Sequence, residues 1–342
     1  MKRKMETDEL RLVALMCVVA LHICSGVAEG AEILSRNWLA AWFWRETWAV
    51  PVFVMISGSH FLRPDREWNL KTLWSKYILR LAVAFGVWSL GYQLYYFVRG
   101  DVDSWKTFCA GLVTGAYHMW FLWMLAGLYA VAPVLQRIAQ DRKIAAYYLL
   151  LALGVQCWTF FLPLILGLEG LSGQVLEKLH PELVLGFSAY FVLGSVLSRW
   201  KPTRRQAALL YIAGILAAVV STAGDLLLSA RAGEGVEHLS RYLSPLTAVQ
   251  AAAMYGLFAR WGERCRHSPA AAKWLEKFGT CGLGAYLSHA LILELCKHSP
   301  VWAWVTAAPW VGIPLLTLAA TAVSILLAMG LRKIPFAGKY IA

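Results

Sequence analysis

An arginine and a histidine share one face of the first apolar segment. Arg11 and His22 lie in the stretch LRLVALMCVVALHICSG, residues 10 to 26. In a helix their separation comes to about 1100°, roughly 20° beyond three full turns, so both side chains point the same way, about 16 Å apart along the axis. Histidine titrates near neutral pH and suits general base catalysis, while arginine binds anionic oxygens. The pair therefore predicts a catalytic face.

Membrane energetics support this interpretation but leave an alternative. An ionisable side chain inside the hydrocarbon costs about 2.5 to 3.5 kcal/mol on insertion scales and usually faces a bundle interior or a water-filled cavity. The alternative is that Arg11 extends to lipid phosphates, while His22 only hydrogen-bonds a neighbouring helix.

Other polar side chains interrupt the later apolar segments. Lys76 and Arg80 stand one helical turn apart at the start of the third segment, where they could bind phosphates or anchor the helix end. His289 and Glu294 both lie inside the ninth segment and indicate a cavity. Asp225, near the end of the seventh segment, is a weaker candidate because it can lie in the interface.

Three further positions are candidates for substrate binding. Ser57 belongs to SGSH at the end of the second segment, where small residues also allow close helix packing. His118 and Trp120 open the fourth segment, where an aromatic belt is the alternative. The predicted substrate-binding residues are Ser57, His118, Trp120, His289 and Glu294.

Composition places these residues in a membrane. Apolar residues make up 59% of the 342 positions and charged residues 15%, a balance that no soluble domain of this size needs for its core. The net charge of +12 could indicate nucleic-acid binding, but the chain contains no long Lys/Arg run. Nucleic acid is therefore excluded as a partner, and an all-α polytopic membrane protein is expected.

Apolar runs long enough to span the hydrocarbon recur about ten times. We place them at 11–30, 42–62, 77–98, 116–135, 145–167, 183–199, 207–229, 244–260, 281–297 and 310–331. Of the 32 Lys and Arg residues, 24 fall in alternate connecting segments or in the terminal ones. The positive-inside rule then places both termini in the cytoplasm, and we expect residues 1–342 to form a single membrane domain.

The first segment and the cysteines need separate interpretation. The first segment has a basic start, but a histidine in its apolar part and a weak cleavage signal favour a retained helix over a signal peptide. The seven cysteines mostly lie in apolar segments and never form CxxC. We interpret them as small core residues and expect no disulfide and no metal site.

Four segments together carry a family resemblance. These are Arg11 with His22 after ten intervening residues, VFVMISG, HMWFLWMLAGLY and a late YLSH. In this order the chain resembles the bacterial acyltransferase 3 family of integral-membrane acyltransferases over nearly its whole length. VPVFVMISG and HMWFLWMLAGLYAVAPVL most resemble the branch that O-acetylates polysaccharide units, exemplified by the enterobacterial common antigen O-acetyltransferase.

The resemblance implies roles for particular residues. His22 would be the catalytic histidine, Arg11 its essential companion, and Arg80 the second arginine of the family's RxxR pattern. Tyr77 occupies the first arginine position, and Lys76 is the nearest base. At this position the chain departs from the family's RxxR pattern. The resemblance further implies acetyl-CoA as the donor, a cell-surface polysaccharide or lipid-linked sugar as the acceptor, and a multi-pass location in the bacterial cytoplasmic membrane.

The residues are consistent with this chemistry. His22 could take the proton of a sugar hydroxyl, while Arg11, Lys76 and Arg80 hold the phosphates of acetyl-CoA. Two other classes stay open. One is a transporter or flippase of lipid-linked saccharide units that relays protons through buried His and Glu. The other is a membrane sensor that binds small ligands without turnover.

Overall fold

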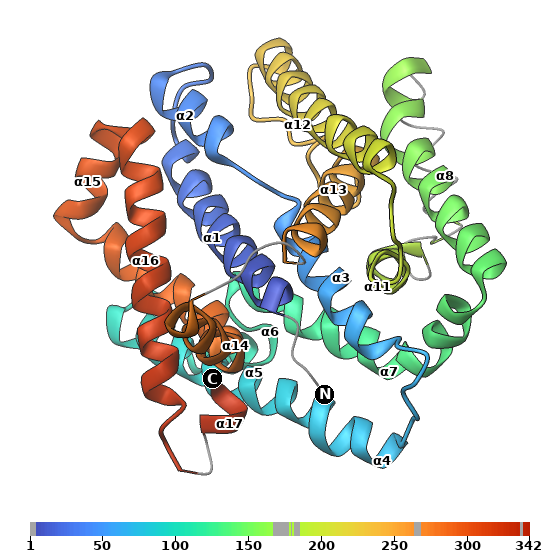
Figure 1. Ribbon diagram of the computed structural model, residues 1–342. Coiled ribbons are helices and arrows are strands. Elements are labelled where there is room, and N and C mark those ends of the chain that lie inside the picture. The colour runs from blue at the N-terminus through green and yellow to red at the C-terminus, as the bar shows by residue number, and fades with distance from the viewer. Residues whose placement is uncertain (1–4, 167–177, 179, 181–184, 263–267, 336–337) are drawn as a thin grey trace.

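Long helices lying side by side make up the protein in the computed structural model (Figure 1), which describes residues 5–166, 178, 180, 185–262, 268–335 and 338–342. No strand occurs among these residues, which confirms the all-α class. The helices are α1 (Met5–Ala28), α2 (Arg36–Trp44), α3 (Ala49–Phe61), α4 (Leu70–Thr72), the π-helix η1 (Leu73–Ile78), α5 (Leu79–Arg99), α6 (Trp105–Thr114), the 3-10 helix η2 (Tyr117–Met119), α7 (Trp120–Gln140), α8 (Arg142–Leu166), α11 (Phe187–Leu197), α12 (Arg204–Ala232), α13 (Pro245–Gly262), α14 (Pro269–Lys297), α15 (Pro300–Ala307), α16 (Pro309–Leu331) and α17 (Gly338–Ile341).

Seven helical stretches of the described chain are long and apolar enough to cross a membrane. They are Met5–Ala28, Leu70–Arg99, Trp105–Gln140, Arg142–Phe161, Arg204–Ala232, Pro269–Lys297 and Pro309–Leu331. This finding confirms a multi-pass membrane protein. The other three predicted spans coincide with α3, α11 and α13, although residues 183 and 184 of the sixth span lie outside the described residues. The count of ten and the cytoplasmic location of the termini stay predictions.

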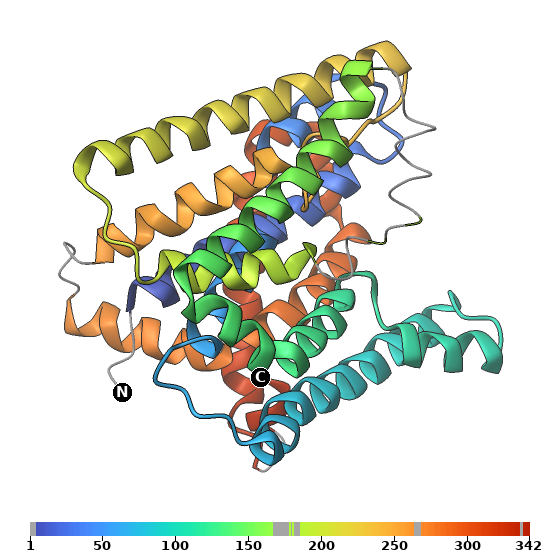
Figure 2. The ribbon, with the colours of Figure 1, turned by 90° about the vertical axis from the view of Figure 1, so that its right-hand side faces the viewer.

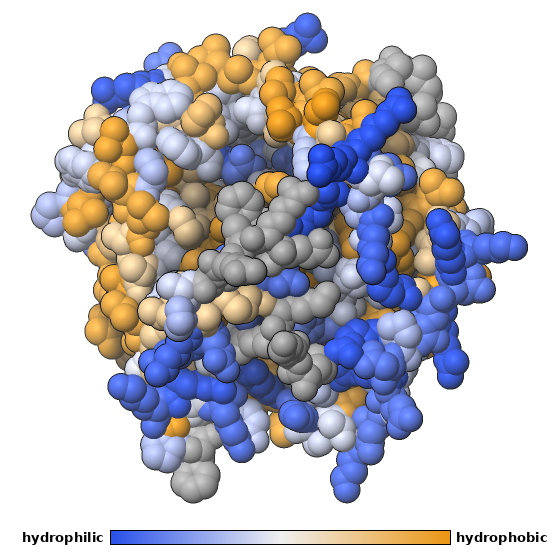
Figure 3. Space-filling model, viewed as in Figure 1, coloured by the Kyte–Doolittle hydropathy of each residue, from blue (hydrophilic) through white to orange (hydrophobic). Residues whose placement is uncertain are grey.

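The outer surfaces of several helices are apolar, as lipid contact requires. On α12 the side chains of Leu209, Ile215 and Val219 are 58%, 65% and 59% exposed, and on α16 Leu326 is 67% exposed. On the face seen in Figure 3, hydrophilic residues gather along the lower edge, where α4 and α17 lie, and hydrophobic residues cover much of the left side. Exposed apolar helix faces of this kind are stable in a bilayer, where no water contacts them.

Helix α1 lies inside the bundle and carries the first predicted pair. It packs against α2, α3, α13, α14 and α16. Its buried side includes Ala14, Leu15, Val19 and Ile23. By contrast, α6 and the end of α5 project beyond the rest of the bundle (Figure 2). A helix enclosed by five others can present polar side chains to a protein interior and not to lipid.

Glycines bring α3 and α11 into close contact. A methyl group on Gly58 would overlap the backbone carbonyl of Phe191, and one on Gly194 would overlap that of Met55. These two helices therefore approach at backbone distance, as small residues allow in membrane bundles. Close helix packing, the alternative to substrate binding for the segment SGSH, therefore explains Gly58.

Candidate functional site

Three histidines that are far apart in the sequence meet at one place. The ring of His22 on α1 stacks on that of His289 on α14, with centroids 5.3 Å apart and an interplanar angle of 24°. His118 of η2 meets His289 edge-on at 5.1 Å. We call His22, His118 and His289 the histidine cluster. It unites three residues that the sequence analysis proposed separately.

Hydrogen bonds orient two of these rings. Nδ1 of His289 donates to the carbonyl oxygen of Tyr286, and Nε2 of His118 donates to that of Leu287 at 3.3 Å. In the neutral rings the other nitrogen of each then lacks a hydrogen and can only accept. These atoms, Nε2 of His289 and Nδ1 of His118, are buried and have no partner. The cluster therefore holds two unused acceptors.

His22 itself is partly exposed and lacks a hydrogen-bond partner within the part of the chain that the structure describes. Its ring contacts are the stack on His289 and an edge contact with Tyr117 at 4.9 Å. The alternative in which His22 merely hydrogen-bonds a neighbouring helix does not describe this arrangement. An accessible imidazole with both nitrogens available is suited to proton transfer.

Tyrosines that the sequence analysis did not select hold the cluster together. The Tyr286 hydroxyl donates to the carbonyl of His118 at 2.8 Å, and its ring lies 5.4 Å from that of His289. The Tyr92 hydroxyl donates to the carbonyl of Leu287 at 2.8 Å and accepts from the amide of Leu291 at 2.9 Å. A usable signal was adjacency, since Tyr117 precedes His118 and Tyr286 lies three residues before His289.

A pocket of about 400 Å³ lies between three arginines and Tyr286, a neighbour of the cluster. We call it the arginine pocket because Arg11, Arg80 and Arg332 line it, with no acidic residue in the lining. Tyr286 also lines it, and the same ring contacts His118 and His289. The pocket therefore joins a cationic mouth to the tyrosine that borders the histidine cluster.

The protein itself provides acceptors for some of the hydrogen-bond donors of the three arginines. Arg11 forms an ion pair with buried Asp8 at 2.7 Å. Arg80 and Arg332 donate to the main-chain oxygen of Ala342 at 2.9 and 3.0 Å. Nε of Arg80 is buried without a partner. Donors of a planar guanidinium that remain available can bind phosphate oxygens.

The other predicted donor-binding and substrate-binding residues divide around this pocket. Ser57 lines it and donates to the carbonyl of Phe53 at 3.0 Å. Lys76 lies in the π-helix η1, is exposed, and is not among the lining residues. Tyr77, at the position of the missing arginine, does line the pocket, and the guanidinium of Arg66 lies 5.0 Å from the centre of its ring. Sequence reasoning missed Arg332, which lines the pocket.

Trp120 and Glu294 lie outside the cluster. Trp120 is 36% exposed and contacts the ring of Tyr242 at 5.7 Å. Glu294 forms an ion pair with Lys297 at 3.1 Å, on the part of α14 beyond His289. The structure thus brings His118 and His289 to His22 and leaves Trp120 and Glu294 at its periphery.

A second pocket, of about 300 Å³, lies at the other end of α1. We call it the tryptophan pocket because the stacked rings of Trp38 and Trp42, 4.3 Å apart, form part of its wall. Ser25 of α1 lines it, and so do Arg45 and Glu237, which form an ion pair. Since Ser25 is one helical turn beyond His22, about 4.5 Å along the axis, the pocket opens close to the cluster.

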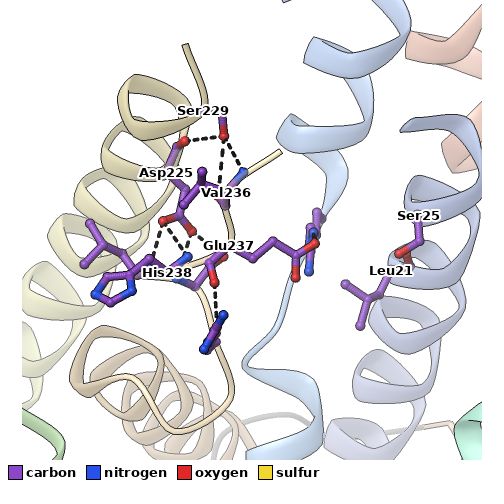
Figure 4. A network of polar contacts seen from close by, with 11 residues as sticks. Leu21, Ser25, Asp225, Ser229, Val236, Glu237 and His238 are labelled. Atoms are coloured by element: carbon purple, nitrogen blue, oxygen red, sulfur yellow. Dashed lines mark hydrogen bonds and ion pairs between the residues drawn. The ribbon is translucent and has the colours of Figure 1, made fainter. Parts of the chain in front are cut away.

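Asp225 has a structural role beside the tryptophan pocket (Figure 4). Its buried carboxylate accepts from the amides of His238, Leu239 and Ser240 at 3.1, 2.7 and 2.9 Å. Ser229 on the same helix accepts from the amide of Val236 at 2.9 Å. These bonds fix the loop that carries Glu237. The polar residue near the end of the seventh span is therefore a loop anchor.

Comparison with known proteins identifies the family of the chain. The model of the acyltransferase 3 family, described as an acyltransferase domain, matches residues 7–329. No curated protein and no solved structure matches the chain significantly. The match begins before Arg11 and extends beyond α14, so it includes all three histidines and two of the three pocket arginines. On this evidence the chain belongs to the acyltransferase 3 family and is an acyltransferase.

Proposed function

We propose that the protein is a membrane O-acyltransferase that moves an acetyl group from acetyl-CoA to a hydroxyl of a cell-surface polysaccharide or lipid-linked sugar, with His22 as general base. The observation that carries the proposal is the position of His22. It is a histidine without a hydrogen-bond partner in the described chain, set between the arginine pocket and the tryptophan pocket.

The reaction needs only groups that this arrangement supplies. His22 takes the proton of the acceptor hydroxyl as its oxygen attacks the thioester carbonyl. The carbon–oxygen bond of the ester forms, the carbon–sulfur bond breaks, and the proton passes to the leaving thiolate to give CoA. His289, stacked on His22, keeps the base oriented, because its own Nδ1 is tied to the carbonyl of Tyr286.

The donor enters through the arginine pocket. Arg11, Arg80 and Arg332 form a cationic mouth that suits the phosphates of CoA. Arg11 and His22 are separated by about 16 Å along α1, which is close to the reach of an extended pantetheine arm. We place the enzyme in the bacterial cytoplasmic membrane, with the arginine pocket facing the cytoplasm that supplies acetyl-CoA.

Transfer of label from acetyl-CoA tests the proposal against its rivals. The purified protein in phosphatidylcholine nanodiscs is incubated with acetyl-labelled CoA and a set of hexosides. An acyltransferase gives labelled hexoside and free CoA in equal amounts. If the protein binds CoA but consumes no acetyl-CoA with any hexoside, a transporter or a sensor is favoured instead.

A further inference from the structure

The two pockets on α1 differ in charge. The arginine pocket is lined by three guanidinium groups and no carboxylate. The tryptophan pocket is lined by one guanidinium, that of Arg45, and two carboxylates, Glu29 and Glu237. A polyanionic nucleotide is attracted to the first pocket and repelled from the second. The tryptophan pocket therefore suits a different, less anionic molecule.

The chemistry of the tryptophan pocket matches a sugar. The indole rings of Trp38 and Trp42 give an apolar wall, while Ser25, Glu29 and Glu237 offer hydrogen-bonding groups at its open side. Nε of Arg45 is buried and has no partner, so this guanidinium has a donor to spare. Apolar walls with a few oriented polar groups are the usual form of a small-molecule site. A hexose presents apolar C–H surface and hydroxyls that both donate and accept.

An apolar groove adjoins this pocket. It has a volume of about 820 Å³ and lies between α1, α12 and α16, with Cys17, Val219 and Leu318 among its lining residues. Figure 1 shows α12 on one side and α1 and α16 on the other. The pocket and the groove share a short segment, because Trp42 and Arg45 line the pocket while Trp44 and Glu46 line the groove.

Resting on the proposed acyl transfer, we infer that the acceptor is a lipid-linked sugar, with its sugar in the tryptophan pocket and its hydrocarbon chain in the apolar groove. The sugar then lies at the end of α1 opposite Arg11, one helical turn from His22, and the chain extends into the depth of the bilayer. Donor and acceptor reach His22 from opposite ends of the same helix.

The side chains of the tryptophan pocket are fixed by their own contacts. Arg45 pairs with Glu237, which the Asp225 network holds in place. Because Ser25 lies three residues beyond His22 on α1, a sugar bound between Ser25 and Arg45 is close to the base that would take its proton.

Photocrosslinking tests the location without requiring turnover. Dodecyl glycosides of glucose, galactose, mannose and N-acetylglucosamine, each with a diazirine on the sugar, are irradiated with the full-length protein in nanodiscs. We expect adducts in the peptides that contain residues 24–45 and 235–237. If no glycoside gives adducts there, the sugar site is elsewhere, whatever the acetyl-transfer assay shows.

Matched bulky variants test each half of the acceptor site. Ser25→Trp fills the tryptophan pocket, and Ala223→Trp fills the groove; both positions are exposed and should tolerate the change. Each should reduce crosslinking and the kcat/KM for dodecyl glycosides about tenfold, a loss of ~1.4 kcal/mol. The control Ala213→Trp is exposed on α12, like Ala223, and the control Glu32→Trp is exposed in the loop that follows α1; neither position lines either cavity.

The outcomes separate the two proposals. Adducts at the expected peptides without acetyl transfer would keep the acceptor site and contradict the proposed activity. Acetyl transfer that Ser25→Trp leaves at wild-type kcat/KM would keep the activity and overturn the sugar site. Methyl glycosides that react as well as dodecyl glycosides, unaffected by Ala223→Trp, would remove the lipid chain from the inference.

Discussion

At the scale of residues, the candidates for binding and catalysis include polar side-chain atoms that have no hydrogen-bond partner in the protein. In the described chain, most buried polar groups have partners, as hydrogen-bonding rules require. Nε2 of His289, Nδ1 of His118 and Nε of Arg80 are among the exceptions, and these three lie at the cluster or at the arginine pocket, while the hydroxyls of Thr247 and Thr321 are exceptions elsewhere. Unpaired polar atoms cost stability, and those at the site are available to a ligand.

His22→Ala should abolish acetyl transfer and leave CoA binding intact. General base catalysis contributes about 10² to 10⁴ in rate, and no described residue depends on His22 for a hydrogen bond. The measurement is label transfer by protein purified from membranes, with CoA binding measured by calorimetry. The control His298→Ala removes an exposed histidine at the end of α14. Wild-type turnover in the His22 variant would rule it out as the base.

Arg332→Ala should weaken CoA binding as Arg80→Ala does, and raised salt should weaken it in the wild type. Both arginines line the pocket, and phosphate contacts are screened by salt. Calorimetry with a nonreactive CoA analogue gives the affinities. Lys76→Ala is the matched control, because Lys76 is exposed and outside the lining. If Lys76→Ala has the larger effect, the phosphates bind outside the arginine pocket.

Some residues of the candidate site could be predicted from the sequence, and others could not. Arg11 and His22 were predictable because both lie on one helix, where spacing determines direction. Arg332 was not predictable, because it follows α16 and reaches the pocket only through the packing of α16 on α14. The contact between His118 and His289 likewise depends on tertiary packing, because the two residues are 171 positions apart in the sequence.

At the scale of elements, close packing of helices positions the site. Gly58→Ala should destabilise the protein by about 1 to 3 kcal/mol, the usual cost of overpacking, because the new methyl group overlaps the Phe191 carbonyl. The measurement is thermal unfolding of the purified protein in detergent. Gly86→Ala is the control, since a methyl group there meets nothing within 4 Å. Equal melting temperatures in the two variants would contradict the α3–α11 contact.

The loop after α12 gives a second test at this scale. Asp225→Asn should raise the KM for the acceptor with little change in CoA affinity. An amide can accept through only one of its atoms, so the paired bonds to the backbone of residues 238–240 are lost in part. Glu237 and Arg45 then lose their fixed positions beside the tryptophan pocket. A variant impaired in CoA binding and unimpaired in acceptor use would contradict this role.

Hydropathy predicted where most helices lie, because burial in lipid imposes a length and a composition. It could not predict the short helices α2 and α6, the π-helix η1, or the close approach of α3 and α11. Those features depend on partners that are distant in the sequence. The broad class was therefore accessible from composition, while the geometry of the pockets was not.

At the scale of the whole molecule, the arginine pocket and the tryptophan pocket follow one another along α1. Arg11 and Ser25 lie on opposite sides of His22 along α1, so the arginine pocket and the tryptophan pocket lie toward opposite ends of this membrane-spanning helix. In the proposed reaction the donor is cytoplasmic acetyl-CoA, which enters through the arginine pocket. The orientation of α1 in the membrane therefore decides whether the acceptor is modified from the outer face.

The distribution of basic residues predicts that orientation. With 24 of 32 Lys and Arg residues in alternate segments, the start of α1 and Arg204 at the start of α12 should be cytoplasmic, while Asp103 and Glu234 should be outside. Single cysteines at 103, 204 and 234, all exposed positions, are introduced into a cysteine-depleted chain and treated with a membrane-impermeant maleimide on spheroplasts. We expect labelling at 103 and 234 at once, and at 204 only after permeabilisation. The reverse pattern would turn the arginine pocket outward, away from acetyl-CoA, and would exclude the proposed route of the donor.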